Sequence, residues 1–195
     1  MLRSNFNKQR SGVTLVEMLI GVAVLGVLLA VAVPSLTGMM ERRRVVATAG
    51  EIASFFAQGR SESAVTDNKV SLHMERVPAA VGEFSCLRLT THRFVDTCTC
   101  NRRANDVCSV GDAKILREFI LPRSSSVRFE ATATGWGFDH YAVTFQRGTY
   151  PTDVKNLMIV VTGIKTNAQL RVEYNNAGRV RTCSPDGSIG GFPAC

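Results

Sequence analysis

A long apolar run near the N-terminus constrains this chain more than any other feature of its sequence. The run extends from Val13 to Val33, and among its 21 residues only Glu17 carries a charge. A helix needs about 20 apolar residues to cross a bilayer, so this run is long enough to span a membrane. A carboxylate inside such a segment is costly without a compensating partner, which makes Glu17 a candidate functional residue.

The segment before the run is short, polar and basic. It carries Arg3, Lys8 and Arg10 and no acidic residue. Positive residues favour the cytoplasmic side, so the sequence predicts an N-terminus inside the cell and the rest of the chain outside. A secretory signal would place its small-residue cleavage site after the apolar run, but here Pro34 follows the run and the small residue Gly12 precedes it.

At its N-terminal segment the chain resembles the type IV prepilins. The residues that carry the resemblance are Gly12, Thr14, Leu15, Glu17 and Pro34. The resemblance implies that a prepilin peptidase cuts between Gly12 and Val13, that Val13 is then N-methylated, and that Glu17 serves filament assembly. Val13 departs from the family, which usually has phenylalanine there. A plain single-span anchor is the alternative, but it would not explain Gly12 and Glu17 at this spacing.

A helical pattern resumes beyond Pro34. Apolar residues recur at spacings of four, three and four, at Val45, Ala49, Ile52 and Phe56. This amphipathic stripe predicts one helix over about 13–64, with a kink at Pro34 because proline removes a backbone hydrogen bond. Glu41, Gln58 and Arg60 lie largely off the stripe. The expected divisions are a cleaved leader (1–12), a membrane or filament-core segment (13–34) and a periplasmic head (35–195).

Beyond residue 68 the apolar period shortens toward two, and short β-rich runs alternate with turn residues. The strand candidates are 70–74, 84–89, 115–121, 127–130, 142–146, 157–161, 170–174 and 179–182. This pattern predicts antiparallel sheets. The run 157–161 is apolar throughout and is expected to be buried on both faces, and 175–178 is a turn signal. The predicted class is α+β, with a long kinked N-terminal helix packed on a β-rich head.

All six cysteines follow the apolar run, at Cys86, Cys98, Cys100, Cys108, Cys183 and Cys195. In an exported domain an even count predicts disulfides. Cys183 and Cys195 bracket a tail rich in glycine and proline, so we expect them to pair, with the other four pairing among themselves. The alternative is a zinc site formed by those four, which the tight spacing of Cys98 and Cys100 disfavours.

No catalytic motif is evident in the sequence. His73, His92 and His140 are scattered, and none lies in a nucleophile or metal motif. Asp139 is adjacent to His140, but neighbouring residues in a strand or loop often point apart. The sequence therefore predicts no enzymatic activity and indicates no cofactor.

The C-terminal part of the chain carries a basic pattern. Gly178, Arg179 and Arg181 follow the predicted turn, and residues two apart in a strand share a face. Two neighbouring guanidinium groups suit phosphate oxygens, and Lys165 and Arg171 could extend the patch. A solvated strand face is the alternative. The net charge of +7 permits an anionic partner without requiring one.

A prepilin-like signal, a long helix, a β-rich head and a terminal Gly-Arg-x-Arg together resemble the GspH/FimT group of minor pilins and pseudopilins. For FimT-like members the resemblance implies DNA binding through Gly178, Arg179 and Arg181 and a role in natural transformation. The implied partners are double-stranded DNA, other major and minor pilins, prepilin peptidase and the inner membrane. A structural minor pilin and a GspH-like pseudopilin of a type II secretion system remain alternatives.

Overall fold

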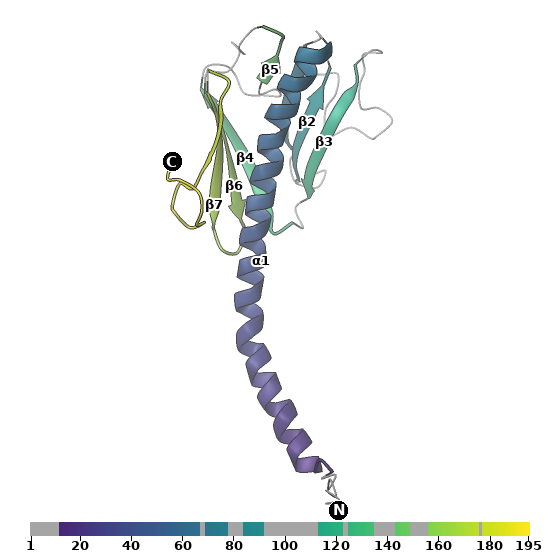
Figure 1. The fold of residues 1–195 in the computed structure, drawn as a ribbon, viewed down its shortest axis with the longest axis vertical. Helices are drawn as coiled ribbons and strands as arrows, with labels where there is room; N and C mark the ends of the chain where they lie inside the picture. The colour runs from purple at the N-terminus through teal and green to yellow at the C-terminus, as the bar shows by residue number, and fades with distance from the viewer. Residues whose placement is uncertain are drawn as a thin grey trace, which may run out of the picture. The chain divides into compact units, whose positions relative to one another are not determined.

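A computed structural model of the chain describes residues 12–66, 69–77, 84–91, 113–122, 125–134, 143–148, 156–175 and 177–195. The chain divides into two compact units, one ending at Met39 and the other running from Met40 to Cys195. Helix α1 (Leu15–Thr66) contributes to both units (Figure 1). Below, the second unit is called the head.

The first unit contains the N-terminal part of α1. Its apolar side chains are exposed, with 75% of Leu15 and 73% of Val31 accessible. A helix that is apolar on all sides is typical of a membrane span. By length and composition α1 is able to cross a membrane. The backbone stays helical through Pro34, as predicted.

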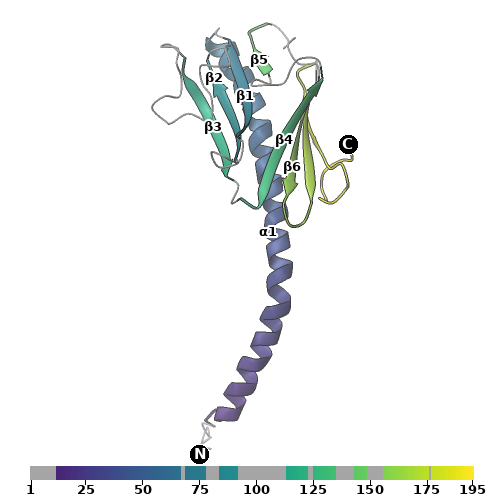
Figure 2. The ribbon, with the colours of Figure 1, turned by 180° about the vertical axis from the view of Figure 1, so that it is seen from behind.

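The head contains the rest of α1 and two four-stranded sheets (Figures 1 and 2). The first sheet has the order β3-β2-β1-β5, and the second has the order β4-β6-β7-β8. The strands are β1 (Val70–Val77), β2 (Phe84–Thr90), β3 (Ile115–Pro122), β4 (Val127–Thr134), β5 (Val143–Phe145), β6 (Asn156–Gly163), β7 (Gln169–Asn175) and β8 (Val180–Cys183). All neighbouring strands are antiparallel, so the predicted strands and the α+β class are confirmed.

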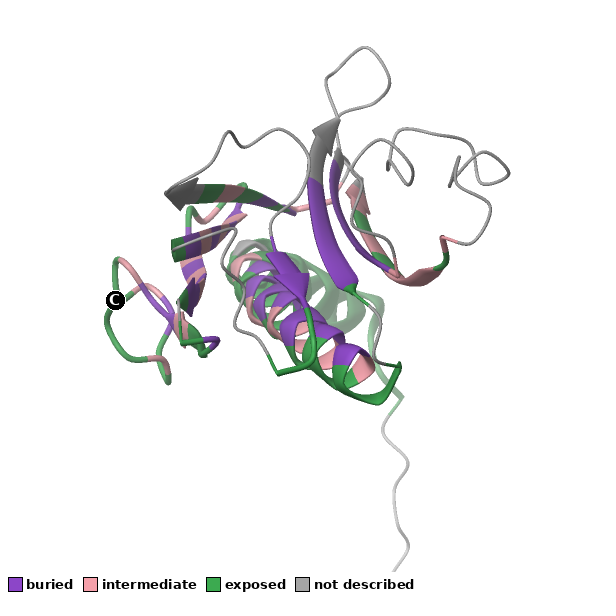
Figure 3. Ribbon diagram, turned by 90° about the horizontal axis from the view of Figure 1, so that it is seen from above, coloured by how far each residue is buried: buried purple, intermediate pink, exposed green. Residues whose placement is uncertain are grey.

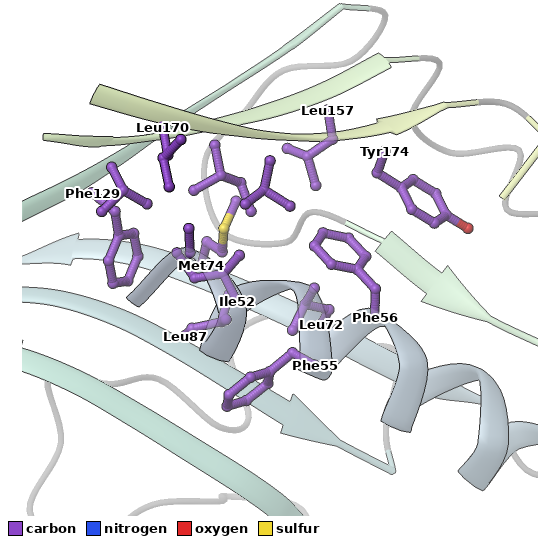
Figure 4. Packing of buried hydrophobic residues seen from close by; sticks show 14 of the residues in the cluster. Ile52, Phe55, Phe56, Leu72, Met74, Leu87, Phe129, Leu157, Leu170 and Tyr174 are labelled. Carbon is purple, nitrogen blue, oxygen red and sulfur yellow. The ribbon is translucent and has the colours of Figure 1, made fainter. Parts of the chain in front are cut away.

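The core of the head lies where α1 meets both sheets. The predicted stripe Val45, Ala49, Ile52 and Phe56 is buried on α1, and Figure 3 shows buried residues on the helix and on the strands of both sheets. In Figure 4 the apolar side chains of α1 point toward those of the two sheets. Fully burying one such side chain contributes about 1.5–3 kcal/mol, which makes this contact the main source of stability.

Aromatic contacts define how α1 sits in the head. The Phe56 ring stacks on Tyr174 of β7, with ring centroids 5.0 Å apart. On the other side, the Arg117 guanidinium of β3 lies 4.4 Å from the centre of the Phe55 ring. Arg117 also pairs with Glu51 at 2.5 Å. The helix is therefore held on one side by the second sheet and on the other by the first.

Glu41 corrects the expectation from the helical stripe, because it is 3% exposed although it lies off the main apolar stripe. Its carboxylate accepts hydrogen bonds from the backbone N–H groups of Lys165 and Thr166 and from the Thr166 hydroxyl. Burial raises the pKa of Glu41, but these hydrogen bonds outweigh it, so the pKa lies below its ordinary value. Through these hydrogen bonds, Glu41 links the β6–β7 turn to α1.

Strand β6 corrects a second expectation. Leu157, Ile159 and Val161 are buried, whereas Met158 and Val160 on the opposite face are only half-buried. The strand therefore alternates rather than being buried on both faces, because its sheet packs against α1 with one face. The other face, called here the outer face, carries the candidate site.

Candidate functional site

Glu17 and Thr14 form a local arrangement at the start of α1. The Thr14 backbone N–H donates to Glu17 Oε2 at 3.2 Å, and the Glu17 N–H donates to Thr14 Oγ1 at 3.2 Å. This reciprocal pair is a capping box, which satisfies two backbone donors at a helix N-terminus. The Thr-x-x-Glu spacing signals it in the sequence, and our sequence analysis missed it. Gly12 and Val13, the predicted cleavage residues, are exposed just before the helix.

The turn between β7 and β8 presents the basic pattern. Asn175 Oδ1 accepts hydrogen bonds from the backbone of Ala177 and Arg179, both at 3.0 Å. Gly178 has a φ of 70°, a backbone conformation that favours glycine. Its N–H donates to the Asn175 carbonyl at 2.8 Å. These contacts give the chain a tight reversal that leads directly into Arg179.

Arg179 and Arg181 are both exposed, at alternate positions along the chain. Arg181 lies opposite Glu173 of β7 in the register, on the outer face of the sheet. One arm of the Arg181 guanidinium donates to the Ala194 carbonyl at 2.6 Å. Arg179 makes no side-chain hydrogen bond within the described part of the chain. The two predicted residues are thus both accessible, but the C-terminal tail positions only Arg181.

The C-terminal tail is held by the disulfide between Cys183 and Cys195, as its sequence position led us to expect. A second contact holds the tail at Ser184, which directly follows β8. The Ser184 N–H donates to the Pro193 carbonyl at 2.9 Å. The tail also buries Ile189, which is 6% exposed, against the core. It is therefore a packed loop beside the arginines rather than a loose end.

Two of the predicted basic residues contribute differently from what the sequence suggested. Arg171 lies on the outer face, but its guanidinium pairs with Glu173 at 3.4 Å and is only 30% exposed. Lys165 is a correction: it lies in the β6–β7 turn, at the end of the sheet opposite Gly178. At about 3.4 Å per residue, the length of β7 separates the two turns by roughly 20 Å. Lys165 therefore does not extend the patch.

Arg60 reaches the β7–β8 turn from α1, on the side of the sheet that packs against the helix, which sequence reasoning did not anticipate. Its Nη1 donates to the Gly178 carbonyl at 2.7 Å, across a sequence separation of 118. Beneath it, the Tyr174 hydroxyl is buried without a hydrogen-bond partner among the described residues. Burial raises the pKa of Tyr174 to about 12, and the Arg60 cation opposes that rise. No local sequence pattern signals this pairing, because it depends on how the helix packs on β7.

The remaining candidates do not form a metal or catalytic centre in the described residues. Cys86 is disulfide-bonded, so it cannot supply the thiolate of the alternative zinc site. Cys98, Cys100 and Cys108 lie outside the described residues, as do His92, Asp139 and His140. Glu173 lies close to Cys183 and Cys195, but their sulfur atoms are already bonded to each other.

His73 is buried in the first sheet. Its Nε2 lies 2.9 Å from the Thr90 hydroxyl oxygen, and the side chain is 4% exposed. This environment fits a structural histidine that cross-links β1 and β2.

Comparison with known proteins covers the N-terminal segment and the fold. A family model described as the prokaryotic N-terminal methylation motif matches residues 7–33. No curated protein matches the chain significantly. The match coincides with the segment in which Gly12, Val13 and Glu17 were singled out, and it ends before the head.

Two solved structures are similar to this chain. One is the type IV minor pilin FimU of Pseudomonas aeruginosa, at 14% identity and a TM-score of 0.46, covering 73% of this chain and 90% of that chain. The other is the minor pseudopilin EpsH from the type 2 secretion system of Vibrio cholerae, at 9% identity and a TM-score of 0.42, covering 73% of this chain and 98% of that chain.

Proposed function

We propose that this chain, whose N-terminus carries a prokaryotic N-terminal methylation motif on an apolar helix, is a type IV minor pilin that binds double-stranded DNA. In this proposal prepilin peptidase cuts between Gly12 and Val13, and Val13 is methylated. The apolar part of α1 anchors the protein in the bacterial inner membrane and then enters the filament with other pilins. The head binds DNA and supports its uptake in natural transformation.

The proposal that the head binds DNA rests on two exposed arginines, Arg179 and Arg181, which lie beside a rigid turn. The Asn175 side chain and the backbone of Gly178 hold the start of this pair, and Ala194 holds one arm of Arg181. Arginine presents a planar fork of N–H donors that matches phosphate oxygens and stays charged at any relevant pH. Holding the Arg181 guanidinium in place reduces the entropy lost on binding.

The same geometry supports binding that is weak and independent of sequence. Arg179 and Arg181 lie on turn and strand residues rather than on a helix that could enter the major groove. Phosphate contacts then supply the affinity, and they carry no sequence information. Such contacts release counterions, so the affinity falls steeply as salt rises. Several copies in one filament would raise the avidity without new contacts.

The test is a fluorescence-anisotropy titration of labelled duplex DNA with the mature protein in a neutral detergent, at several salt concentrations. Arg179→Ala and Arg181→Ala are each expected to weaken binding severalfold for every sequence and to lower the slope of log K against log salt by about 1. Lys165→Ala removes an exposed cation from the opposite end of the sheet and serves as the matched control, with a smaller effect expected.

Two outcomes would contradict the proposal. Wild-type protein that does not bind DNA at low salt would remove the DNA-binding role. Equal binding by the wild type and the Arg179→Ala/Arg181→Ala double variant would place the interface elsewhere. In the first case a structural minor pilin, or a GspH-like pseudopilin of a type II secretion system, would be the better description, because both share the N-terminal segment; in the second, Arg179 and Arg181 would not be the DNA-binding residues.

A further inference from the structure

We propose that Arg60 of α1 is a third phosphate-binding residue of the surface formed by Gly178, Arg179 and Arg181. This inference rests on the proposed DNA-binding function and names a residue that lies far from the Gly-Arg-x-Arg stretch in the sequence. It predicts that the interface spans two elements, the end of α1 and the start of β8.

The geometry brings Arg60 next to Arg179. The Arg60 Nη1 atom lies 2.7 Å from the Gly178 carbonyl oxygen. That carbonyl belongs to the peptide bond that joins Gly178 to Arg179. Standard backbone dimensions therefore place the guanidinium within roughly 5–6 Å of the Arg179 Cα atom. The Arg60 guanidinium thus lies beside the backbone that leads into Arg179, although the two residues are far apart in the sequence.

Both Arg60 and Arg179 are exposed, so their charges are accessible to a ligand. The more buried arginines of the head are neutralised: Arg88 pairs with Glu118, Arg117 with Glu51 and Arg171 with Glu173. Arg60 and Arg179 form no ion pair with any carboxylate in the described residues. A phosphate group would supply the negative charge that no carboxylate of the described residues supplies to them.

Arg60 retains the donors that such an anion needs. A guanidinium has five N–H groups, and one of them is directed at the Gly178 carbonyl. The side chain is exposed, so other N–H groups can reach a ligand. The hydrogen bond to Gly178 also reduces the freedom of both the turn and the arginine. Arg60 therefore both supports the turn and offers a preorganised fork to a DNA phosphate.

Variants at position 60 separate a phosphate contact from a purely structural role. We expect Arg60→Gln, which removes the charge, to weaken DNA binding severalfold and to lower the salt slope by about 1. Arg60→Lys keeps the charge and should retain most of that slope. Arg128→Gln, on the exposed face of β4 at the far edge of the same sheet, is the matched control for loss of one arginine charge. Thermal denaturation of each variant reports whether the fold is intact.

A second measurement needs no variant. Phenylglyoxal modifies accessible arginines, and mass spectrometry locates the modified residues. A saturating DNA duplex at low salt should protect Arg60 and Arg179 together, whereas Arg128 should remain reactive.

The outcomes distinguish this inference from the function on which it rests. If wild-type protein fails to bind DNA, the proposed function is wrong. If the wild type binds and Arg179→Ala weakens binding, but Arg60→Gln keeps the wild-type salt slope and Arg60 stays reactive under DNA, then Arg60 is not a phosphate ligand and only supports the turn.

Discussion

At the scale of single residues, the neighbours of a charged group decide what that group can bind. Arg171 and Arg181 both lie on the outer face, yet Glu173 pairs with Arg171 and lies opposite Arg181 in the register. Arg179 precedes β8, and its backbone N–H is bonded to the Asn175 amide oxygen rather than to a carboxylate. Position in a basic stretch is thus a weaker guide to phosphate binding than the carboxylates that surround each arginine.

At the other end of the chain, the neighbours of Glu17 also decide what its carboxylate can bind. Its carboxylate accepts a hydrogen bond from the Thr14 N–H, so a capping role explains its position without any partner. The prepilin resemblance instead implies a charge pair with the N-terminal amine of a neighbouring subunit. The two roles make different demands, because glutamine can complete a capping box but carries no charge.

We therefore predict that Glu17→Gln keeps α1 intact and permits processing, but strongly reduces incorporation into filaments. Circular dichroism measures the helix, mass spectrometry checks that the mature chain starts at a methylated Val13, and immunoblotting of sheared filaments measures incorporation. Thr14→Ala is the control, since it weakens the cap and leaves the charge. Normal incorporation of Glu17→Gln would mean that Glu17 is only a capping residue.

At the scale of elements, the β6–β7 turn is built around a buried carboxylate. Gly163 has no side chain because a Cβ atom there would lie 2.6 Å from Glu41 Oε1. The Thr166 hydroxyl and two backbone N–H groups complete the shell around this carboxylate. The head therefore depends on an ionised Glu41 to join α1 to the second sheet.

This arrangement predicts a pH dependence. The pKa of folded Glu41 lies below the ordinary value of 4.5, so the ionised carboxylate stabilises the head above about pH 4.5 and loses this effect as the pH falls through the folded pKa. Glu41→Gln should cost about 1–3 kcal/mol at pH 7 through weakened hydrogen bonds, and less at pH 3.

Thermal denaturation of the two proteins at both pH values measures this difference. Glu62→Gln, on the same helix but away from the β6–β7 turn, should match the wild type at each pH. A Glu41→Gln effect that is equal at pH 7 and pH 3 would contradict a stabilising role for the ionised form.

At the scale of the whole head, the tail closes against the outer face and links stability to the candidate interface. The Cys183–Cys195 bond joins residues 12 positions apart. The closed loop places the Ala194 carbonyl against Arg181 and buries Ile189. One covalent link thus holds both a core contact and the candidate phosphate-binding residue Arg181.

Replacing Cys183 and Cys195 with alanine should lower the free energy of unfolding by up to about 3 kcal/mol, because the bond restricts the unfolded tail. DNA binding should weaken modestly while the salt slope stays unchanged, since the number of charges is the same. Denaturant titration and the anisotropy assay measure the two effects. Non-reducing peptide mapping of the wild type is the control, and free thiols at these positions would contradict the pairing.

Local patterns in the sequence were sufficient for much of this protein. The apolar run, the helical stripe beyond Pro34 and the eight strands follow from the spacing of apolar residues, which depends only on backbone periods and burial. The residues of the methylation motif are contiguous, so a linear pattern identifies them. The 175–178 turn also follows from local chemistry, because Asn175 and Gly178 act on their own backbone.

The tertiary structure alone decided which charges meet. It buried Glu41 beneath the β6–β7 turn, placed Lys165 at the end of the sheet away from Gly178, and paired Arg171 with Glu173. It also brought Arg60 to the Gly178 carbonyl across 118 positions. Contacts of this kind depend on strand order and on the packing of α1 against both sheets. Those are set by the combined burial of many apolar side chains, so no short stretch of sequence carries them.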